Sequence, residues 1–581
     1  MFAATHSVCV SIHRTFETAP TRRRRALNGR WAFVTDPDDE GLDAEYHESF
    51  PADADRIDVP SAWNATSEYY DHEGPAWYRR RFGLPAGGPT RIAFGGVCHD
   101  ATVWVDGERV AEHYGGYTPF EAVLDLDAGD HDIVVRADNT RDERSIPRPG
   151  TDWFPYGGIT REVLVESVPE VFVADVEIEY DLDGNAADLS VTADVRNLGE
   201  STDVEVTAAV EGAQNAPVTG SGEATAEREV TVDAGTTSVP VECELAVDRW
   251  SPDDPALYGV RVAVESGEAR DERRERVGFR TVAVSDAAVL VNGDPVELRG
   301  VNRHEDHPEW GHAQPLRIQE IDLDMVTEAG MNTVRTSHYP NHPRFLDLCD
   351  ERGILAIEEI PYWQFDAERF GREGVLDRGK AMLAETIARD HAHPAVVAWS
   401  VTNECANEEA GVVQATRELA ALARERDPNG RPVTLASNNY HSDGDGTDSC
   451  LEHVDFVCAN AYPGWYAEGE YANVLAAVRE DYPDKPVVLS EFGAGAVAGE
   501  RTRDGAKWSE SFQADFLSDA VGTARETEYV AGFTVWQFCD TRTDPRNWAT
   551  RPKTKNNKGI VDEYRRPKEA YHRVSDMLGG E

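Results

Sequence analysis

Lysine is scarce in this 581-residue chain. Only seven lysines occur, and 107 acidic against 57 basic side chains give a formal net charge of −50 at pH 7. This charge argues against nucleic acid and against membrane surfaces as partners. It is typical of halophilic proteins, because molar salt screens charge repulsion within about 3 Å while exposed carboxylates keep the chain hydrated. We therefore expect folding and activity to need high salt.

Long apolar runs and paired cysteines are also absent. No stretch approaches the ~18 uncharged apolar residues of a membrane-spanning helix, and the arginines at 22–25 precede Ala26-Leu-Asn-Gly-Arg-Trp31, not an apolar export segment. We therefore predict a cytoplasmic protein. The cysteines lack the short spacings of zinc or redox motifs, so we expect reduced thiols and no structural metal. We also predict that the protein needs no cofactor. They are Cys9, Cys98, Cys243, Cys349, Cys405, Cys450, Cys458 and Cys539.

Length and composition predict several folded domains. At roughly 100–200 residues per domain the chain has room for about three to five, and 40% hydrophobic residues suffice for real cores. Residues 1–168 show short apolar runs cut by turn residues, and Asp106-Gly107 after an alternating run predicts a hairpin. Residues 169–284 alternate more regularly, for example at Leu189 and Val191, which predicts a small antiparallel sandwich.

Residues 285–581 alternate buried-looking strands with amphipathic helices such as 318–329 and 382–392. Eight units of this kind predict a closed parallel (β/α)8 barrel, a TIM barrel, whose active site lies on loops at the carboxyl ends of the strands. The eight candidate strands are 296–301, 333–337, 354–357, 396–402, 432–436, 456–459, 487–490 and 532–537.

Two glutamates follow barrel strands on nearly opposite sides. Glu404 ends the fourth strand and Glu491 the seventh, so both should point into one mouth. A lone glutamate at a strand end more often caps a helix or meets an arginine. A pair suits glycosidic cleavage, in which one carboxyl stays protonated to release the leaving oxygen while the other, ionised, attacks or stabilises the sugar cation.

Polar and aromatic residues near these strand ends fit a sugar site. Asn403 offers an amide to a sugar 2-hydroxyl, although it is equally suited to forming a turn. Flat rings stack on the C–H faces of sugars and exclude water, although a single aromatic residue is more often part of a core. The aromatic candidates are Tyr462, Trp465, Tyr466 and Trp536.

Several motifs resemble glycoside hydrolase family 2, and in particular its β-glucuronidase branch, over nearly the whole chain. The resemblance implies an N-terminal jelly roll over 1–168, an immunoglobulin-like sandwich over 169–284 and a catalytic barrel over 285–581. The motifs are Leu27-Asn-Gly-Arg-Trp31, Trp77-Tyr-Arg-Arg80, Gly115-Gly-Tyr-Thr-Pro-Phe120, Trp250-Ser-Pro, Pro255-Ala-Leu-Tyr258, Gly278-Phe-Arg280, Gly300-Val-Asn-Arg-His-Glu-Asp306, Arg335-Thr-Ser-His-Tyr-Pro340 and His393-Pro-Ala-Val-Val-Ala-Trp-Ser-Val-Thr-Asn-Glu404.

The resemblance also implies roles for individual residues. Glu404 is similar to the family's general acid/base and Glu491 to its nucleophile, which implies retention through a covalent glycosyl-enzyme and carboxyls about 5–5.5 Å apart. Tyr462 matches the tyrosine beside the nucleophile, where it can keep the carboxylate ionised, or else simply packs at the rim. Asp152 and His338 resemble residues that bind the sugar, and both could instead be structural hydrogen-bonders.

The segment Asn556-Asn-Lys558-Gly559 resembles the pair that grips the C6 carboxylate in β-glucuronidases. Three of the seven lysines fall within 553–558, and a solvated or acid-paired cluster is the alternative. Family members carry an arginine four residues before this asparagine, whereas here Pro552 holds that position and Arg551 lies one step away. A short-range cationic clamp suits an anionic substrate of an acidic protein in high salt.

The predicted function is therefore a retaining exo-glycosidase that hydrolyses terminal β-D-glucuronides. A β-galacturonidase or β-galactosidase on the same frame is the alternative, and a carbohydrate-binding protein that has lost the chemistry is a third. The predicted partner is a small-molecule or oligosaccharide glucuronide. The family resemblance also implies a homo-oligomer, either a dimer or a tetramer.

Overall fold

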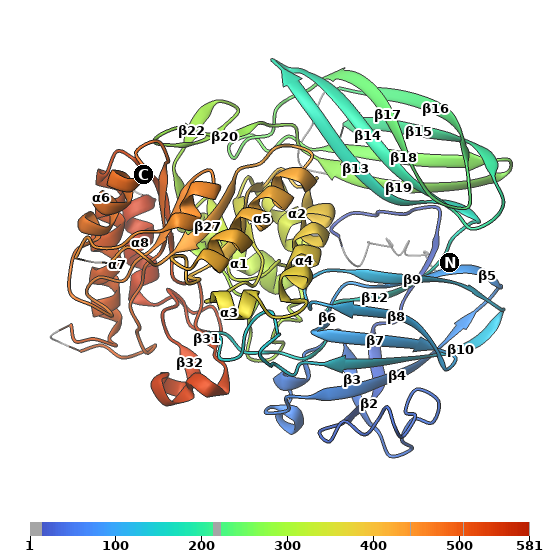
Figure 1. Cartoon of the computed structure of the whole chain (residues 1–581), viewed down its shortest axis with the longest axis horizontal. Coiled ribbons are helices and arrows are strands. Elements are labelled where there is room, and N and C mark those ends of the chain that lie inside the picture. Colours follow the sequence, from blue (N-terminus) through green and yellow to red (C-terminus); the bar gives the residue numbers. More distant parts are fainter. Residues whose placement is uncertain (1–13, 213–221, 442, 503–504, 580–581) are drawn as a thin grey trace, which may run out of the picture.

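A computed structural model describes residues 14–212, 222–441, 443–502 and 505–579, and it has three parts (Figure 1). Two β-sandwiches lie side by side at one end of the molecule, and a barrel surrounded by helices forms the other end. Cys9 lies outside the described residues, and the other seven cysteines form no disulfide within them. No helix of the described ranges is long and apolar enough to span a bilayer.

The N-terminal part consists of two main antiparallel sheets packed around buried aromatic and aliphatic side chains. The predicted hairpin at Asp106 is confirmed, because Asp106 and Gly107 have φ angles of 52° and 85° and join β7 (Asp100–Val105) to β8 (Glu108–Tyr114) as the tight turn requires. The first sheet has the order β1 (Arg23–Ala26), β12 (Val163–Ser167), β5 (Gly88–Phe94) and β9 (Phe120–Leu126). The second has the order β3 (Asp55–Val59), β2 (Gly29–Thr35), β4 (Pro75–Leu84), β10 (Gly129–Asp138), β7 (Asp100–Val105) and β8 (Glu108–Tyr114).

The second part is the predicted antiparallel sandwich. Leu189, Val191, Ala193 and Val195 are all buried and alternate with partly exposed residues, as expected for strands with one face on a core. One sheet contains β13 (Val171–Asp183), β14 (Ala186–Asn197) and β17 (Gly235–Ala246). The other contains β16 (Ala224–Val232), β15 (Thr202–Gly212), β18 (Tyr258–Ser266) and β19 (Ala269–Val277).

The third part is the predicted closed barrel of eight parallel strands. All eight predicted segments overlap the observed strands, whose residues are nearly all buried; most are apolar runs, whereas β24 (Thr333–Thr336) reads Thr-Val-Arg-Thr. The strands are β23 (Leu298–Asn302), β24 (Thr333–Thr336), β25 (Leu355–Glu359), β26 (Val396–Asn403), β27 (Val433–Ser437), β28 (Val457–Asn460), β29 (Val487–Glu491) and β30 (Val530–Val535). The helices are α1 (Leu316–Glu328), α2 (Pro343–Arg352), α3 (Ala367–Phe370), α4 (Val375–Asp390), α5 (Ala410–Arg426), α6 (Tyr471–Asp481), α7 (Glu510–Glu526) and α8 (Glu569–Leu578).

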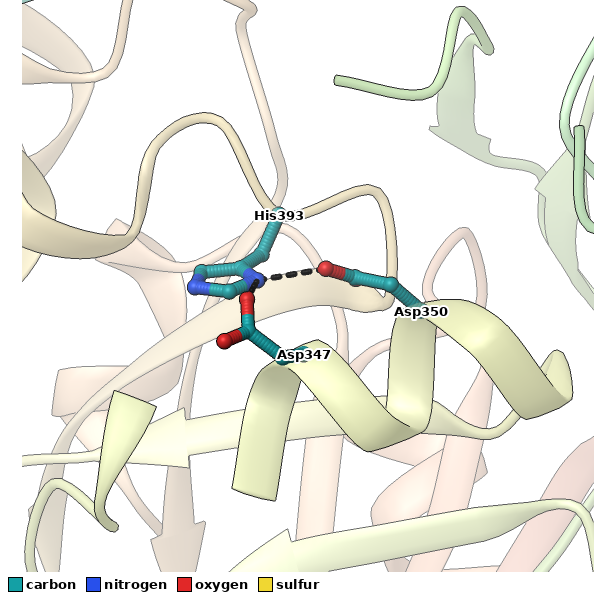
Figure 2. Close-up of side chains that lie close together, drawn as sticks. All are labelled: Asp347, Asp350 and His393. Atoms are coloured by element: carbon teal, nitrogen blue, oxygen red, sulfur yellow. Dashed lines mark hydrogen bonds and ion pairs between the residues drawn. The ribbon is translucent and has the colours of Figure 1, made fainter. Parts of the chain in front are cut away.

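A buried charged cluster ties the three parts together, and Figure 2 shows its members in the barrel part, Asp347, Asp350 and His393. Arg14, which precedes β1, donates to Asp347 on α2 at 2.9 Å and to Glu275 on β19 at 3.0 Å. On the same helix Asp350 bonds Nδ1 of His393 at 2.5 Å. Asp347, Asp350 and His393 offer ligand atoms within 4.8 Å of one another, but their oxygens already bind Arg14 and His393. We therefore interpret the cluster as a link between domains.

Candidate active site

A cavity of about 790 Å³ opens where the barrel strands end, and loop residues 148–152 of the N-terminal part form one of its walls. Eight of the ten predicted site residues line this cavity: Asp152, His338, Glu404, Tyr462, Glu491, Trp536, Arg551 and Lys558. The other two lie directly behind the wall. Asn403 accepts a hydrogen bond from Asn460 at 3.1 Å, and Asn556 donates to Asp152 at 2.8 Å. The fold thus gathers residues that are up to 406 positions apart in the chain.

Glu404 immediately follows β26 and is partly exposed to the cavity. Its backbone has a φ of 50°, an uncommon conformation for a residue other than glycine. The carboxyl accepts hydrogen bonds from Gln364 at 2.9 Å and from Asn460 at 3.1 Å. Desolvation by the surrounding protein and the negative charge of Glu491 together raise the pKa of Glu404. A raised pKa favours the protonated form that a general acid needs.

Glu491 is the last residue of β29 and has a different environment. It is 3% exposed, and its two oxygens accept hydrogen bonds from Arg335 at 2.8 Å and from Tyr462 at 2.9 Å. Donors to both oxygens stabilise an ionised carboxylate. The two glutamates therefore sit in unequal surroundings. The pKa of Glu404 is raised, which favours its protonated form, whereas Glu491 accepts hydrogen bonds from a guanidinium group and a phenol.

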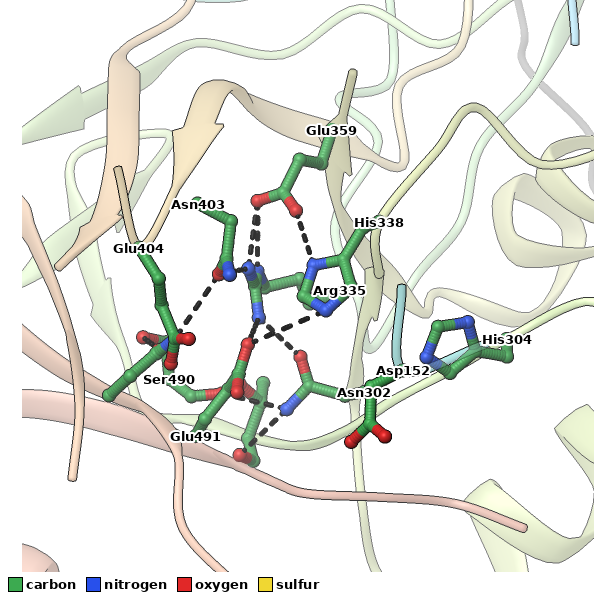
Figure 3. A network of polar contacts seen from close by, with 12 residues as sticks. Asp152, Asn302, His304, Arg335, His338, Glu359, Asn403, Glu404, Ser490 and Glu491 are labelled. Carbon is green, nitrogen blue, oxygen red and sulfur yellow. Dashed lines mark hydrogen bonds and ion pairs between the residues drawn. The ribbon is translucent and has the colours of Figure 1, made fainter. Parts of the chain in front are cut away.

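Arg335, on β24, is the centre of the buried polar network beneath the cavity (Figure 3). Besides Glu491, its guanidinium donates to Glu359 at 2.8 Å, to Asn403 at 2.6 Å and to Asn302 at 2.7 Å. A planar fork with five donors can orient several acceptors at once. Sequence reasoning assigned no role to Arg335 or Glu359, although Arg335 opens one of the quoted motifs and Glu359 ends the third strand.

Asn403 presents a free donor at this network. Its side-chain oxygen is held by Arg335 and Asn460, which fixes the orientation of the amide. Its Nδ2 is buried and has no hydrogen-bond partner among the described residues. A buried donor left unpaired costs roughly 1–3 kcal/mol, so the site gains when a hydroxyl binds there.

His338 is fixed from two sides. Its Nδ1 lies 2.7 Å from Glu359, and its ring stacks on Trp536 at a centroid distance of 5.0 Å. Its Nε2 lies 3.9 Å from Glu491. His338 and Trp536 therefore form a rigid wall beside the nucleophile candidate.

Lys558 and Arg551 are two of the cations that line the cavity. Lys558 is 2% exposed, and its ammonium group lies 5.8 Å from the ring centre of Tyr462 and 5.2 Å from that of Tyr466. No carboxylate of the described residues lies within ion-pair distance of it. Arg551, by contrast, donates to both oxygens of Asp152, at 3.0 and 2.7 Å. In this structure Arg551 and Asn556 thus orient the carboxylate of Asp152.

The three clustered lysines have separate surroundings. Lys555 pairs with Glu563 and Lys553 is exposed, so the alternative of solvated or acid-paired charges describes these two.

Among the aromatic candidates after β28, Tyr466 lines the cavity and is 62% exposed. Trp465 packs edge-on against Trp508 at 5.0 Å instead.

Comparison with known families agrees with this architecture. Residues 282–579 match the TIM barrel domain of "Glycosyl hydrolases family 2", residues 24–169 match its sugar binding domain, and residues 171–280 match the domain described as "Glycosyl hydrolases family 2". The chain is 28% identical to a protein named beta-glucuronidase from Paenibacillus borealis, covering 96% of this chain and 97% of the relative. It is 30% identical to a beta-glucuronidase from Canis lupus familiaris, covering 95% and 90%.

Solved structures give the same family. A GH2 beta-galacturonidase from Eisenbergiella tayi bound to galacturonate has a TM-score of 0.87 and 32% identity, covering 98% of this chain and 99% of that one. A beta-glucuronidase from Ruminococcus gnavus in complex with uronic isofagomine has a TM-score of 0.83 and 28% identity, covering 96% and 98%. These comparisons confirm the predicted resemblance and fold class. The chain belongs to glycosyl hydrolase family 2 and is a glycoside hydrolase.

Proposed function

We propose that this enzyme hydrolyses terminal β-D-glucuronides with retention of configuration. The observation that carries the preference for uronides over neutral glycosides is Lys558, a buried cation that faces the cavity without a carboxylate of the described residues in ion-pair distance. In a chain of net charge −50, such a cation is suited to an anionic group of the substrate. The C6 carboxylate distinguishes a uronide from a neutral galactoside.

In the first step of the proposed mechanism, Glu491 attacks the anomeric carbon while Glu404 donates its proton to the leaving oxygen. The bond to the leaving group breaks and a covalent glycosyl-enzyme forms. In the second step Glu404, now ionised, takes a proton from water, whose oxygen attacks the anomeric carbon and releases Glu491. Two inversions at the same carbon give net retention.

Neighbouring residues would stabilise the transition state. The free Nδ2 of Asn403 is available to the 2-hydroxyl of the sugar, a contact that strengthens as the ring gains positive charge. Tyr462 and Arg335 donate to the two oxygens of Glu491 and orient the carboxyl group for attack. Trp536 and His338 offer a flat, water-excluding wall to the ring.

A β-galacturonidase is the second candidate. Structures of a galacturonidase from Eisenbergiella tayi share 32% of their sequence with this chain, against 28% for the Ruminococcus gnavus glucuronidase. Glucuronate and galacturonate differ only in the configuration of the 4-hydroxyl, and both carry the C6 carboxylate. A cation such as Lys558 therefore suits both substrates and does not separate them.

The test is turnover of three aryl β-glycosides, a glucuronide, a galacturonide and a galactoside, at several molar salt. We expect the largest kcat/KM for the glucuronide, and the first sugar released should be the β-anomer by proton NMR. Lys558→Gln should lower kcat/KM for both uronides, whereas Lys553→Gln, a matched change at an exposed position, should not. Turnover of the galactoside alone, or release of the α-anomer first, would contradict the proposal.

A further inference from the structure

The cavity extends beyond the uronide end. Its volume of about 790 Å³ lies at the upper end of the roughly 300–1,000 Å³ of sites for drug-sized ligands, so it has room for a leaving group beside the terminal sugar. Glu404 marks the boundary between the two halves, because the general acid protonates the oxygen that joins them. We take the lining residues that contact Gln364, which donates to Glu404, as the leaving-group half.

Arg148 lies in that half. Its guanidinium donates to the backbone oxygen of Gln364 at 3.2 Å, and the side chain of Gln364 donates to Glu404 at 2.9 Å. Arg148 and Asp152 belong to one loop of the N-terminal part, and Asp152 is bound to Arg551 at the uronide end. Four residues span at most about 14 Å, so this loop brings Arg148 within that distance of Asp152.

Arg148 lacks a counter-charge in close contact. No carboxylate of the described ranges forms an ion pair with it, and its Nε is buried without a hydrogen-bond partner. Burial and the positive charge of Arg369 lower the pKa of Arg148, and the charges of Asp366 and Glu143, neither of which forms an ion pair with it, offset this only in part. The third lining cation, Arg551, is by contrast neutralised by Asp152.

The surroundings of Arg148 suit a sugar. Its guanidinium lies 5.8 Å from the ring centre of Trp363, which lines the same cavity and offers an aromatic face to C–H groups. Other walls carry the polar side chains of Asn438, Tyr440 and Asn547. A polar enclosure of this kind favours a hydroxylated leaving group over a lipophilic one.

We propose that Arg148 and Trp363 form a subsite for an acidic sugar on the leaving-group side of the scissile bond. The preferred substrates are then acidic oligosaccharides, in which the terminal uronide is followed by a sugar carrying a carboxylate or a sulfate ester. This proposal rests on the proposed uronidase function. Lys558 then binds the carboxylate of the terminal uronide, and Arg148 binds the anionic group of the sugar that forms the leaving group.

The experiment compares three β-glucuronyl disaccharides that differ only at C6 of the second sugar, which carries a hydroxyl, a carboxylate or a sulfate ester. The readout is the ratio of kcat/KM for each acidic disaccharide to kcat/KM for the neutral one. We expect a wild-type ratio of at least tenfold for one acidic form, and the form with the larger ratio identifies the anion. Arg148→Gln should bring the ratio close to one, and Arg148→Lys should keep part of it.

Arg144→Gln is the matched control, because Arg144 is an exposed arginine of the same loop and should leave the ratio unchanged. Circular dichroism and thermal unfolding establish that each variant is folded. A wild-type ratio near one, or a ratio that survives Arg148→Gln, would overturn the subsite while leaving the uronidase function intact. Failure of the wild-type enzyme to cleave any glucuronide or galacturonide would overturn both.

Discussion

Tyr462 donates its phenolic hydroxyl to Glu491 at 2.9 Å, on the oxygen that Arg335 does not bind. Burial and the charges of Glu491 and Glu404 raise the pKa of Tyr462 well above its ordinary value, so the phenol keeps its proton at any working pH. The tyrosine is therefore a permanent donor to the carboxylate proposed as nucleophile.

Tyr462→Phe should lower kcat for an aryl glucuronide by roughly 10- to 100-fold, because a hydrogen bond to a charged group contributes about 1.5–3 kcal/mol. Steady-state kinetics at constant salt measures this loss. Tyr564→Phe, at a 45% exposed position, serves as the control and should retain full activity. A Tyr462→Phe enzyme with unchanged kcat would contradict the assigned role.

The pH profile should report the environment of Glu404. Because kcat/KM requires the protonated acid, activity should fall as pH rises through the raised pKa of Glu404. Gln364 donates to Glu404 and thus stabilises the ionised form. Gln364→Met removes that donor, so the pKa should rise further and the alkaline limb of kcat/KM should move up by about 0.5–1 pH unit. An alkaline limb that stays in place or moves down would refute this assignment.

The need for an acid can be tested through the leaving group. Glu404→Gln cannot donate a proton, so cleavage of an alkyl glucuronide should fall by about 10³-fold. A glucuronide of a strongly acidic phenol needs little protonation, and its glycosylation step should fall far less. Single-turnover release of the phenol and of the alcohol measures the two effects. Equal losses for both substrates would argue that Glu404 acts in another way.

Local sequence patterns were sufficient for the barrel and for the two glutamates. Most barrel strands are short runs of apolar residues, and Glu404 and Glu491 are recognisable because they stand at the ends of such runs. Carboxyl ends of parallel strands converge in a closed barrel, so their positions along the chain already imply that they lie in one mouth.

Contacts between distant segments could not be predicted in this way. Asp152 and Arg551 are 399 residues apart, and no local pattern indicates that they bind each other. Arg335 orients Glu491 from another strand, and that role depends on cross-barrel distance. Lys555 and Lys558 belong to one cluster in the sequence. In the folded chain Lys555 forms an ion pair with Glu563 while Lys558 faces the cavity, and the sequence alone does not indicate this difference.

The interdomain cluster predicts a pH-dependent stability. Asp347 is buried, which opposes ionisation, but Arg14, Arg276 and His393 lower its pKa to about 2. A lowered pKa stabilises the folded state above the unfolded value near 4, by about 2 kcal/mol, and this stabilisation is lost as pH falls from about 4 to about 2. Asp347→Asn removes one of the two carboxylates that pair with Arg14, the other being Glu275, and should cost about 3 kcal/mol at neutral pH.

Denaturant unfolding at fixed salt checks this prediction. The difference in the free energy of unfolding between wild type and Asp347→Asn should shrink between pH 4 and pH 2, because the wild-type carboxylate becomes protonated there. Asp253→Asn changes an exposed aspartate and should have little effect at any pH. A constant difference down to pH 2 would indicate that the cluster is not held by charge.

Salt dependence tests the interpretation of the net charge. With 107 acidic side chains against 57 basic ones, dilution should restore repulsion among exposed carboxylates and lower Tm. The Debye length falls from about 10 Å at 0.1 M to about 3 Å at 1 M. The part of the Tm increase that comes from charge screening should therefore be nearly complete at about 1 M salt. A further rise above 1 M would come from salt exclusion, which sucrose at equal osmolality should reproduce. A Tm that stays constant from tenths of molar to several molar salt would contradict the halophilic interpretation.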